Sequence, residues 1–132
     1  MTTTRSQIPG AAIYLASFFL PAVGTGAGAW GWLCAWLALT APFGEVRGAL
    51  GLLLLGSGLI NVLVLAYAGA RAFGARVAVR FRIALITLCL VPMSWIAIAL
   101  LREPVRIGHV VWIAGLLLIM LPDVIAFFRG EK

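Results

Sequence analysis

Two long apolar stretches, residues 48–70 and 83–101, flank a short segment that holds four arginines and no acidic residue (residues 71–82, RAFGARVAVRFR). About 20 apolar residues are enough for a helix to cross the hydrocarbon core of a bilayer. Positively charged loops resist translocation and remain on the cytoplasmic side. The sequence therefore predicts two membrane-spanning helices joined by a cytoplasmic segment. Its arginines would also lie near lipid headgroups: Arg71, Arg76, Arg80 and Arg82.

The composition of the whole chain supports a membrane protein. Hydrophobic residues make up 64% of the 132 residues and charged residues only 11%, whereas a soluble domain carries roughly 25% charged residues. Too few polar groups remain to cover a surface that faces water, so the lipid bilayer is the expected solvent. The net charge of +6 does not indicate nucleic acid, because the basic residues fall between apolar stretches rather than along one soluble face.

The remaining apolar sequence predicts two further crossings and one shorter helix. Residues 107–128 are long enough to span a bilayer. Residues 8–44 are uncharged, too long for one crossing and too short for two, and the glycine-rich sequence 24–29 after Pro21 divides them. We expect a first spanning helix over residues 8–23. Residues 30–41 would form a short helix that lies in the outer interface or re-enters the membrane.

These elements predict an all-α, polytopic membrane protein with a single integral-membrane domain, residues 1–132. Its four transmembrane helices (8–23, 48–70, 83–101 and 107–128) would form a bundle, with the interfacial or re-entrant helix between the first two. The expected location is the inner membrane of a bacterium, with both termini in the cytoplasm. Seven basic residues then lie inside and three outside, as the positive-inside rule requires; the outer three are Arg47, Arg102 and Arg106.

The tryptophans agree with this orientation, because all five fall in the outer half of the predicted bundle. Indole rings prefer the headgroup level, where one edge is apolar and the N–H is wet. We therefore expect interface anchors at Trp30, Trp32, Trp36, Trp95 and Trp112. Packing of the first three inside the bundle is the alternative.

Polar residues within the predicted helices are few, and they fall at similar depths. Asp123 lies about 24 Å from the outer end of the last helix, counted at the helical rise. A carboxylate at that depth costs free energy unless it is paired or neutral, which makes it a functional candidate. The same count brings Tyr14, Asn61 and Thr87 into the inner half of the membrane, and Ser57 lies four residues before Asn61 on the same helix face. We predict one polar cluster composed of Tyr14, Ser57, Asn61, Thr87 and Asp123.

Two roles for Asp123 remain open at this point. The carboxylate could pair with an arginine of residues 71–82, or bond backbone groups freed by Pro122, and so hold helices together. It could instead handle protons or couple the transport of a substrate.

Small residues in the first half of the second spanning helix indicate close helix packing, because they allow backbones to approach each other in lipid. Two of them also have the G-x-x-x-G spacing. The expected packing residues are Gly44, Gly48, Gly51, Gly56 and Gly58.

The chain holds few residues suited to catalysis or metal binding. His109, the only histidine, is a candidate pH sensor at the outer start of the last helix, or an interface histidine bonded to water or backbone. One histidine with few acids predicts no metal site, and Cys34 and Cys89 form no C-x-x-C pair. Neither a nucleophile elbow nor a phosphate-binding glycine loop is present. We therefore expect no cofactor and no enzymatic activity.

Two functions fit these features. The first is a non-enzymatic protein that binds another membrane protein, as an accessory subunit of a complex or as an immunity-type protein. The second is a small channel or transporter that works as a homo-oligomer, with Asp123 as the intramembrane coupling site.

Overall fold

The computed structural model describes residues 3–26, 28–44, 46 and 48–130 of the chain. Its elements in order are α1 (Thr3–Ser17), β1 (Pro21–Val23), β2 (Ala29–Trp30), α2 (Gly31–Thr40), the 3-10 helix η1 (Ala41–Phe43), α3 (Gly48–Ala72), α4 (Val77–Leu101) and α5 (Ile107–Phe128). Three helices, α3, α4 and α5, are long and apolar enough to cross a membrane. The fold is helical, as predicted, apart from one short hairpin. Arg47 and Lys132, used in the charge count, lie outside the described residues, as does the side chain of Arg5.

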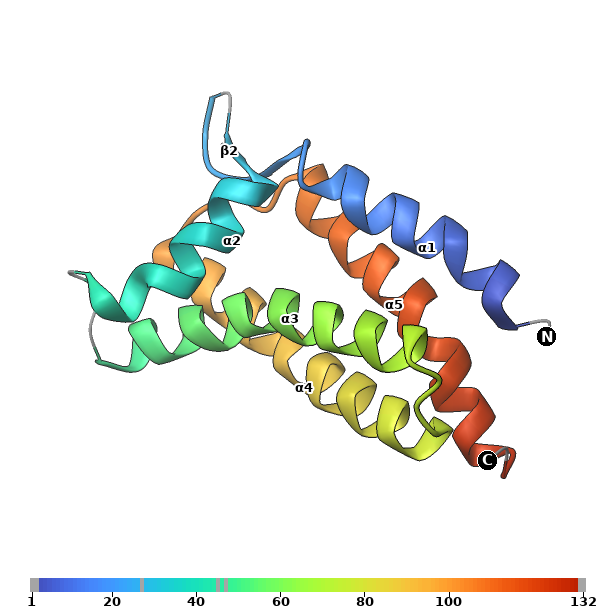
Figure 1. Ribbon diagram of the computed structural model, residues 1–132. Helices are drawn as coiled ribbons and strands as arrows, with labels where there is room; N and C mark the ends of the chain where they lie inside the picture. Colours follow the sequence, from blue (N-terminus) through green and yellow to red (C-terminus); the bar gives the residue numbers. More distant parts are fainter. Residues whose placement is uncertain (1–2, 27, 45, 47, 131–132) are drawn as a thin grey trace.

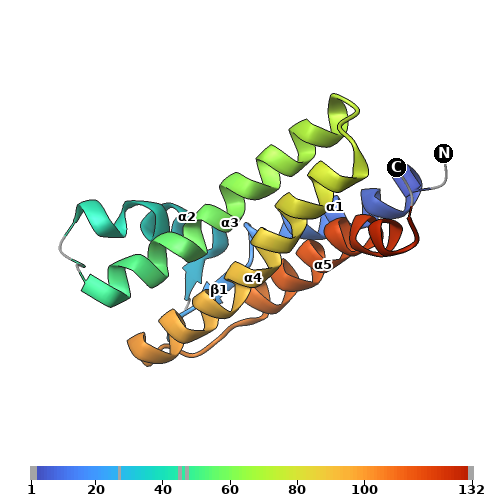
Figure 2. The same cartoon turned by 90° about the horizontal axis from the view of Figure 1, so that it is seen from below.

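The long helices form two antiparallel pairs. Helix α1 packs along α5 and α3 along α4, and contact between α4 and α5 joins the pairs (Figure 1). Helix α2 crosses one end of the molecule beside α3 and β1. Figures 1 and 2 both place the start of α1, the end of α5 and the α3–α4 turn together at the opposite end. We call this the inner end, and the end that holds α2 the outer end.

The first helix lies five to six residues earlier than the sequence predicts, at Thr3–Ser17 instead of residues 8–23. Pro9 removes one backbone hydrogen bond but does not end the helix. After Ser17 the backbone bonds tighten to the i to i−3 pattern through Leu20, and Pro21 disfavours helical backbone at Leu20. The chain then forms the hairpin of β1 and β2, where Gly24, Gly26 and Gly28 adopt positive φ angles that glycine accepts without strain.

The arginine segment is mostly helical rather than a loop. Helix α3 continues to Ala72 and α4 begins at Val77, six residues before the predicted start. Only residues 73–76 form the turn, with Gly74 at a φ of +68°. Arginine is a good helix former, and its long side chain lets the charged group reach out of an apolar environment. The arginines therefore do not mark the ends of the helices here.

The α4–α5 turn closes the outer end by pairing with the hairpin. Val105 forms a β-bridge with Val23, and the backbone N–H of Arg106 donates to the carbonyl of Ala22 at 2.9 Å. The Arg106 side chain donates from Nε to the Gly24 carbonyl at 2.8 Å and from Nη2 to the Gly26 carbonyl at 3.2 Å. One arginine thus holds the hairpin against α5.

Replacing Arg106 with glutamine should loosen this hairpin, because both side-chain hydrogen bonds come from a charged donor and such bonds contribute about 1.5–3 kcal/mol. Limited proteolysis at residues 24–28 should become at least several-fold faster in the variant. Arg102→Gln is the matched control, since Arg102 is exposed in the same turn. Equal cleavage of both variants would contradict a clamp at Arg106.

Glycines allow the helices to approach closely, although at partly different positions from those predicted. A Cβ added at Gly56 would lie 2.6 Å from the Met93 sulfur on α4, and one at Gly58 would lie 2.8 Å from the Leu39 backbone nitrogen on α2. Gly51 similarly meets the Val46 carbonyl at 2.7 Å. Among the described residues, a Cβ added at Gly44 would meet only the Ala41 carbonyl of η1 at 3.8 Å, so the G-x-x-x-G pair Gly44 and Gly48 shows no tight helix contact there. Gly48 begins α3 with a φ of +74° and open space around it.

The close approach of α1 and α5 rests on two glycines outside the predicted set. A Cβ at Gly115 would lie 2.7 Å from the Tyr14 Cα atom, and a Cβ at Gly10 would lie 2.8 Å from the Leu118 Cβ atom. The hydrophobic core lies beside this contact and joins it to α3 and α4: Tyr14, Ile60, Val64, Tyr67, Ala84, Leu116, Ile119 and Met120.

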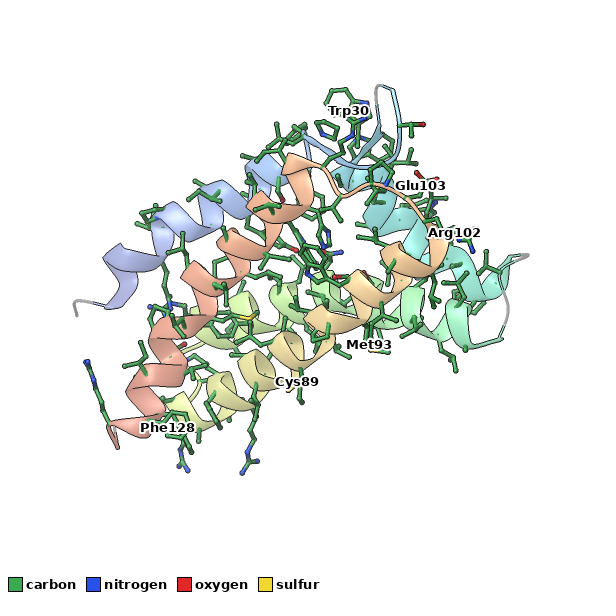
Figure 3. The ribbon with its side chains drawn as sticks, turned by 180° about the vertical axis from the view of Figure 1, so that it is seen from behind. Trp30, Cys89, Met93, Arg102, Glu103 and Phe128 are labelled. Carbon is green, nitrogen blue, oxygen red and sulfur yellow. The ribbon has the colours of Figure 1, made fainter. Side chains whose placement is uncertain are left out.

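Aromatic side chains are distributed between the two ends. Figure 3 shows Trp30 with Arg102 and Glu103 at the outer end and Phe128 at the inner end. Trp30, Trp32, Trp36 and Trp95 are exposed, as interface anchors would be. Trp112 instead packs against the core, so its environment differs from the one expected.

Candidate functional site

The buried charges gather at the inner end around Asp123 of α5, which is 1% exposed. Its Oδ2 atom accepts a hydrogen bond from the Tyr67 hydroxyl at 2.5 Å. The same oxygen lies 3.4 Å from Nη1 of Arg71 and 3.4 Å from Nη1 of Arg80. Tyr67 also accepts a hydrogen bond from Gln7 of α1 at 3.3 Å. We call these five residues the inner ion cluster; it connects α1, α3, α4 and α5.

The local sequence explains how the cluster forms. Tyr67 and Arg71 are four residues apart, so both lie on one face of α3. Arg80 lies in the first turns of α4, on the other side of the α3–α4 turn. A buried carboxylate is stable only when it is paired. In the low-dielectric interior, two arginine side chains and one hydroxyl group pair with the carboxylate of Asp123. The cluster carries a formal charge of +1, from one carboxylate and two guanidinium groups.

A second polar group lies nearer the outer end, around Asn61 of α3. The Tyr14 hydroxyl donates to Asn61 Oδ1 at 2.6 Å, and the Trp112 indole N–H donates to the same atom at 3.1 Å. These bonds connect α1, α3 and α5. Tyr67 lies six residues after Asn61, about 9 Å farther along the axis of α3.

The polar residues predicted to form one cluster are therefore divided in the structure. Tyr14 and Asn61 are in contact, whereas Asp123 belongs to the inner ion cluster. Thr87 is fully buried and donates to the carbonyl of Ile83 in its own helix. Ser57 lines a cavity one helical turn from Asn61. The number of residues counted along each helix places Tyr14 at the depth of Asn61, and the two side chains are in contact. Depth alone, however, does not specify in which direction a side chain points around its helix.

His109 lies close to this second polar group. Its Nε2 atom is 3.4 Å from Ser94 Oγ, and its ring stacks on Trp112 and meets Trp95 edge to face. It is 8% exposed. His109 is thus a buried side chain, in contact with Ser94 and two tryptophans.

A cavity of about 570 Å³ opens beside these residues, and we call it the outer chamber. Helix α2 and the hairpin form one side, and α3, α4 and α5 the other. Its walls are apolar except for a few side chains, among them Ser57, Asn61, Ser94 and His109. A volume of this size is within the range of small-molecule sites, which are typically apolar with a few polar groups.

No known protein family, curated protein or solved structure matches this chain.

Several site residues were missed by sequence reasoning. Tyr67, Gln7 and Ser94 all make the contacts described above, and none was predicted. The spacing of Tyr67 and Arg71 on one helix face was a usable signal, because it places a hydroxyl beside a cation at the depth of Asp123. For Gln7 the partner lies 60 residues away, and for Ser94 it lies on the next helix, so spacing along one helix could not identify either contact.

Proposed function

We propose that this protein is a four-crossing protein of a bacterial inner membrane that acts by binding another membrane protein, without catalysis. The observation that carries this proposal is the shortness of the connections. Residues 73–76 and 102–106 are all that join α3 to α4 and α4 to α5. These turns are too small for a soluble binding or catalytic site, so contact through helix faces and α2 is the activity that the fold favours.

The proposed topology has both termini and the α3–α4 turn in the cytoplasm. The location of the start of α1, the end of α5 and this turn at one end of the molecule supports it (Figure 2). Helix α1 is short for a crossing, about 22 Å at the helical rise. It runs along α5, so the two helices would cross the same part of the bilayer.

Cysteine labelling tests this topology. In a variant with Cys34 and Cys89 replaced by alanine, Thr25→Cys in the hairpin should react with an impermeant maleimide in intact spheroplasts. Phe73→Cys in the α3–α4 turn should react only after the membrane is opened; both positions are exposed. Reaction of Phe73→Cys in intact spheroplasts would reverse the orientation.

The partner is proposed to contact the outer end through α2. Trp32 and Trp36 project from this helix and are 55% and 63% exposed. Aromatic side chains are enriched at protein interfaces and contribute strongly to their affinity. A second copy of this chain could also bind to this surface. The experiment below distinguishes a second copy from a different protein.

A photo-crosslinking amino acid at position 36 should capture one defined membrane protein in cells, at a stoichiometry confirmed by native mass spectrometry. The matched control is position 65, because Leu65 is exposed on α3 to 73% but lies away from α2. Equal, diffuse crosslinking from both positions would contradict a partner site on α2.

The transport alternative is less well supported. A coupling carboxylate must exchange its partners during a cycle, whereas Asp123 is already bound by Tyr67, Arg71 and Arg80. Its role in this proposal is to hold the helices together.

A further inference from the structure

The amide of Asn61 has a defined orientation, and this fixes what it offers to the outer chamber. An indole N–H can only donate, so the Asn61 atom that meets Trp112 must be the oxygen. Tyr14 donates to the same oxygen. Among the described residues no acceptor takes the Nδ2 hydrogens, and Asn61 lines the chamber. The chamber wall therefore carries an amide donor.

His109 complements this donor with an acceptor. Ser94 Oγ donates its single proton to the Val91 carbonyl at 2.7 Å, so it can only accept from His109 Nε2. In the neutral ring Nδ1 is then the acceptor. No donor among the described residues bonds to Nδ1. Stacking against Trp112 and an edge-to-face contact with Trp95 hold the ring in this position.

The rest of the lining determines the charge of the ligand. Among the described residues no Asp, Glu, Lys or Arg lines the chamber. An ionised head group would lose its hydration here without gaining a counter-charge, which is costly in an apolar site. Leucine, isoleucine and alanine side chains of α2, α3 and α4 supply much of the remaining surface, which suits a hydrocarbon chain.

From this arrangement we propose that the outer chamber binds a single-chain lipid with an uncharged hydroxyl head, such as a long-chain alcohol or a monoacylglycerol. The hydroxyl oxygen accepts a hydrogen bond from Asn61 Nδ2, and the hydroxyl proton is donated to His109 Nδ1. The chain lies along the apolar walls beneath α2. This site goes beyond the proposed function, because it needs no protein partner.

Quenching of Trp112 fluorescence tests the proposal directly. The full-length protein, with its other tryptophans replaced by phenylalanine, is titrated in nanodiscs with a dibrominated long-chain alcohol. We expect saturable quenching and binding about tenfold tighter than that of the same chain ending in a methyl group, since two neutral hydrogen bonds distinguish the ligands. Chains ending in carboxylate, phosphate or trimethylammonium should bind no better than the methyl-ended chain.

Two variants identify the polar contacts. Asn61→Leu and His109→Phe should each reduce the preference for the alcohol over the methyl-ended chain several-fold. His109→Phe retains a ring that can stack on Trp112, so it tests the acceptor even if Asn61→Leu fails to fold. Cys89→Ala is the matched control, because Cys89 is exposed on α4 and outside the chamber lining (Figure 3).

The proposal is overturned if the methyl-ended or an ionised chain binds as tightly as the alcohol, or if neither variant changes the preference. Crosslinking from position 36 would be unaffected by that result, so failure of the lipid site and failure of the partner site are distinguishable.

Discussion

Replacing Asp123 with leucine is expected to lower the free energy of unfolding by about 3–5 kcal/mol, because removing one partner of a buried ion pair is strongly destabilising. The Arg71 and Arg80 side chains are only 19% and 17% exposed, and both would lose their carboxylate. Tyr67 would lose its short hydrogen bond as well. Unfolding by sodium dodecyl sulfate in mixed micelles, followed by circular dichroism, measures the change.

The control for this variant is Glu103→Gln, which removes an exposed carboxylate at the outer end (Figure 3) and should change stability by no more than about 0.5 kcal/mol. Combining Asp123→Leu with Arg80→Gln should recover part of the loss, because one unpaired cation is removed. Unchanged unfolding of Asp123→Leu together with loss of a measured ion flux would favour the transport function instead.

Replacing Gly115 with alanine should cost about 1–3 kcal/mol through overpacking. The added methyl group would lie 2.7 Å from the Tyr14 backbone, which cannot move unless α1 separates from α5. Tyr14 would then be displaced from Asn61, so a change in Trp112 fluorescence should accompany the loss. Detergent unfolding provides the stability measurement.

Gly69→Ala is the matched control, because Gly69 lies inside α3 and nothing is within 4 Å of an added Cβ. Alanine favours a helix interior over glycine by about 1 kcal/mol. The two identical chemical changes should therefore have opposite signs. Destabilisation by both would show that the cost comes from the helix itself rather than from the α1–α5 contact.

The three long helices could be predicted because charge and glycine bound their apolar stretches. Helix α5 begins after Arg106 and ends before Arg129, where the hydropathy changes abruptly. The first helix was misplaced because residues 8–44 hold no charge, so only Pro21 and the glycines marked a boundary. The hairpin was missed for a related reason: its stability comes from Arg106 and Val105, which lie about 80 residues away.

The candidate site was predictable to a smaller extent. An arginine partner for Asp123 followed from its depth, and both Arg71 and Arg80 lie within 3.4 Å of it. The division into two polar groups did not follow, because rise along a helix gives the depth of a residue but not the direction of its side chain. The outer chamber depends on how α2 packs against the other helices, and no local pattern encodes that packing.

The α1–α5 contact has a consequence for biosynthesis. Helix α1 has its main packing surface, around Gly10, on α5, which the ribosome makes after α3 and α4. Helices α3 and α4 can pair as soon as α4 has been made, whereas the surface of α1 that packs on α5 stays uncovered until α5 has been made. Chains truncated before α5 should therefore keep the α3–α4 pair and leave α1 exposed to membrane quality-control proteases.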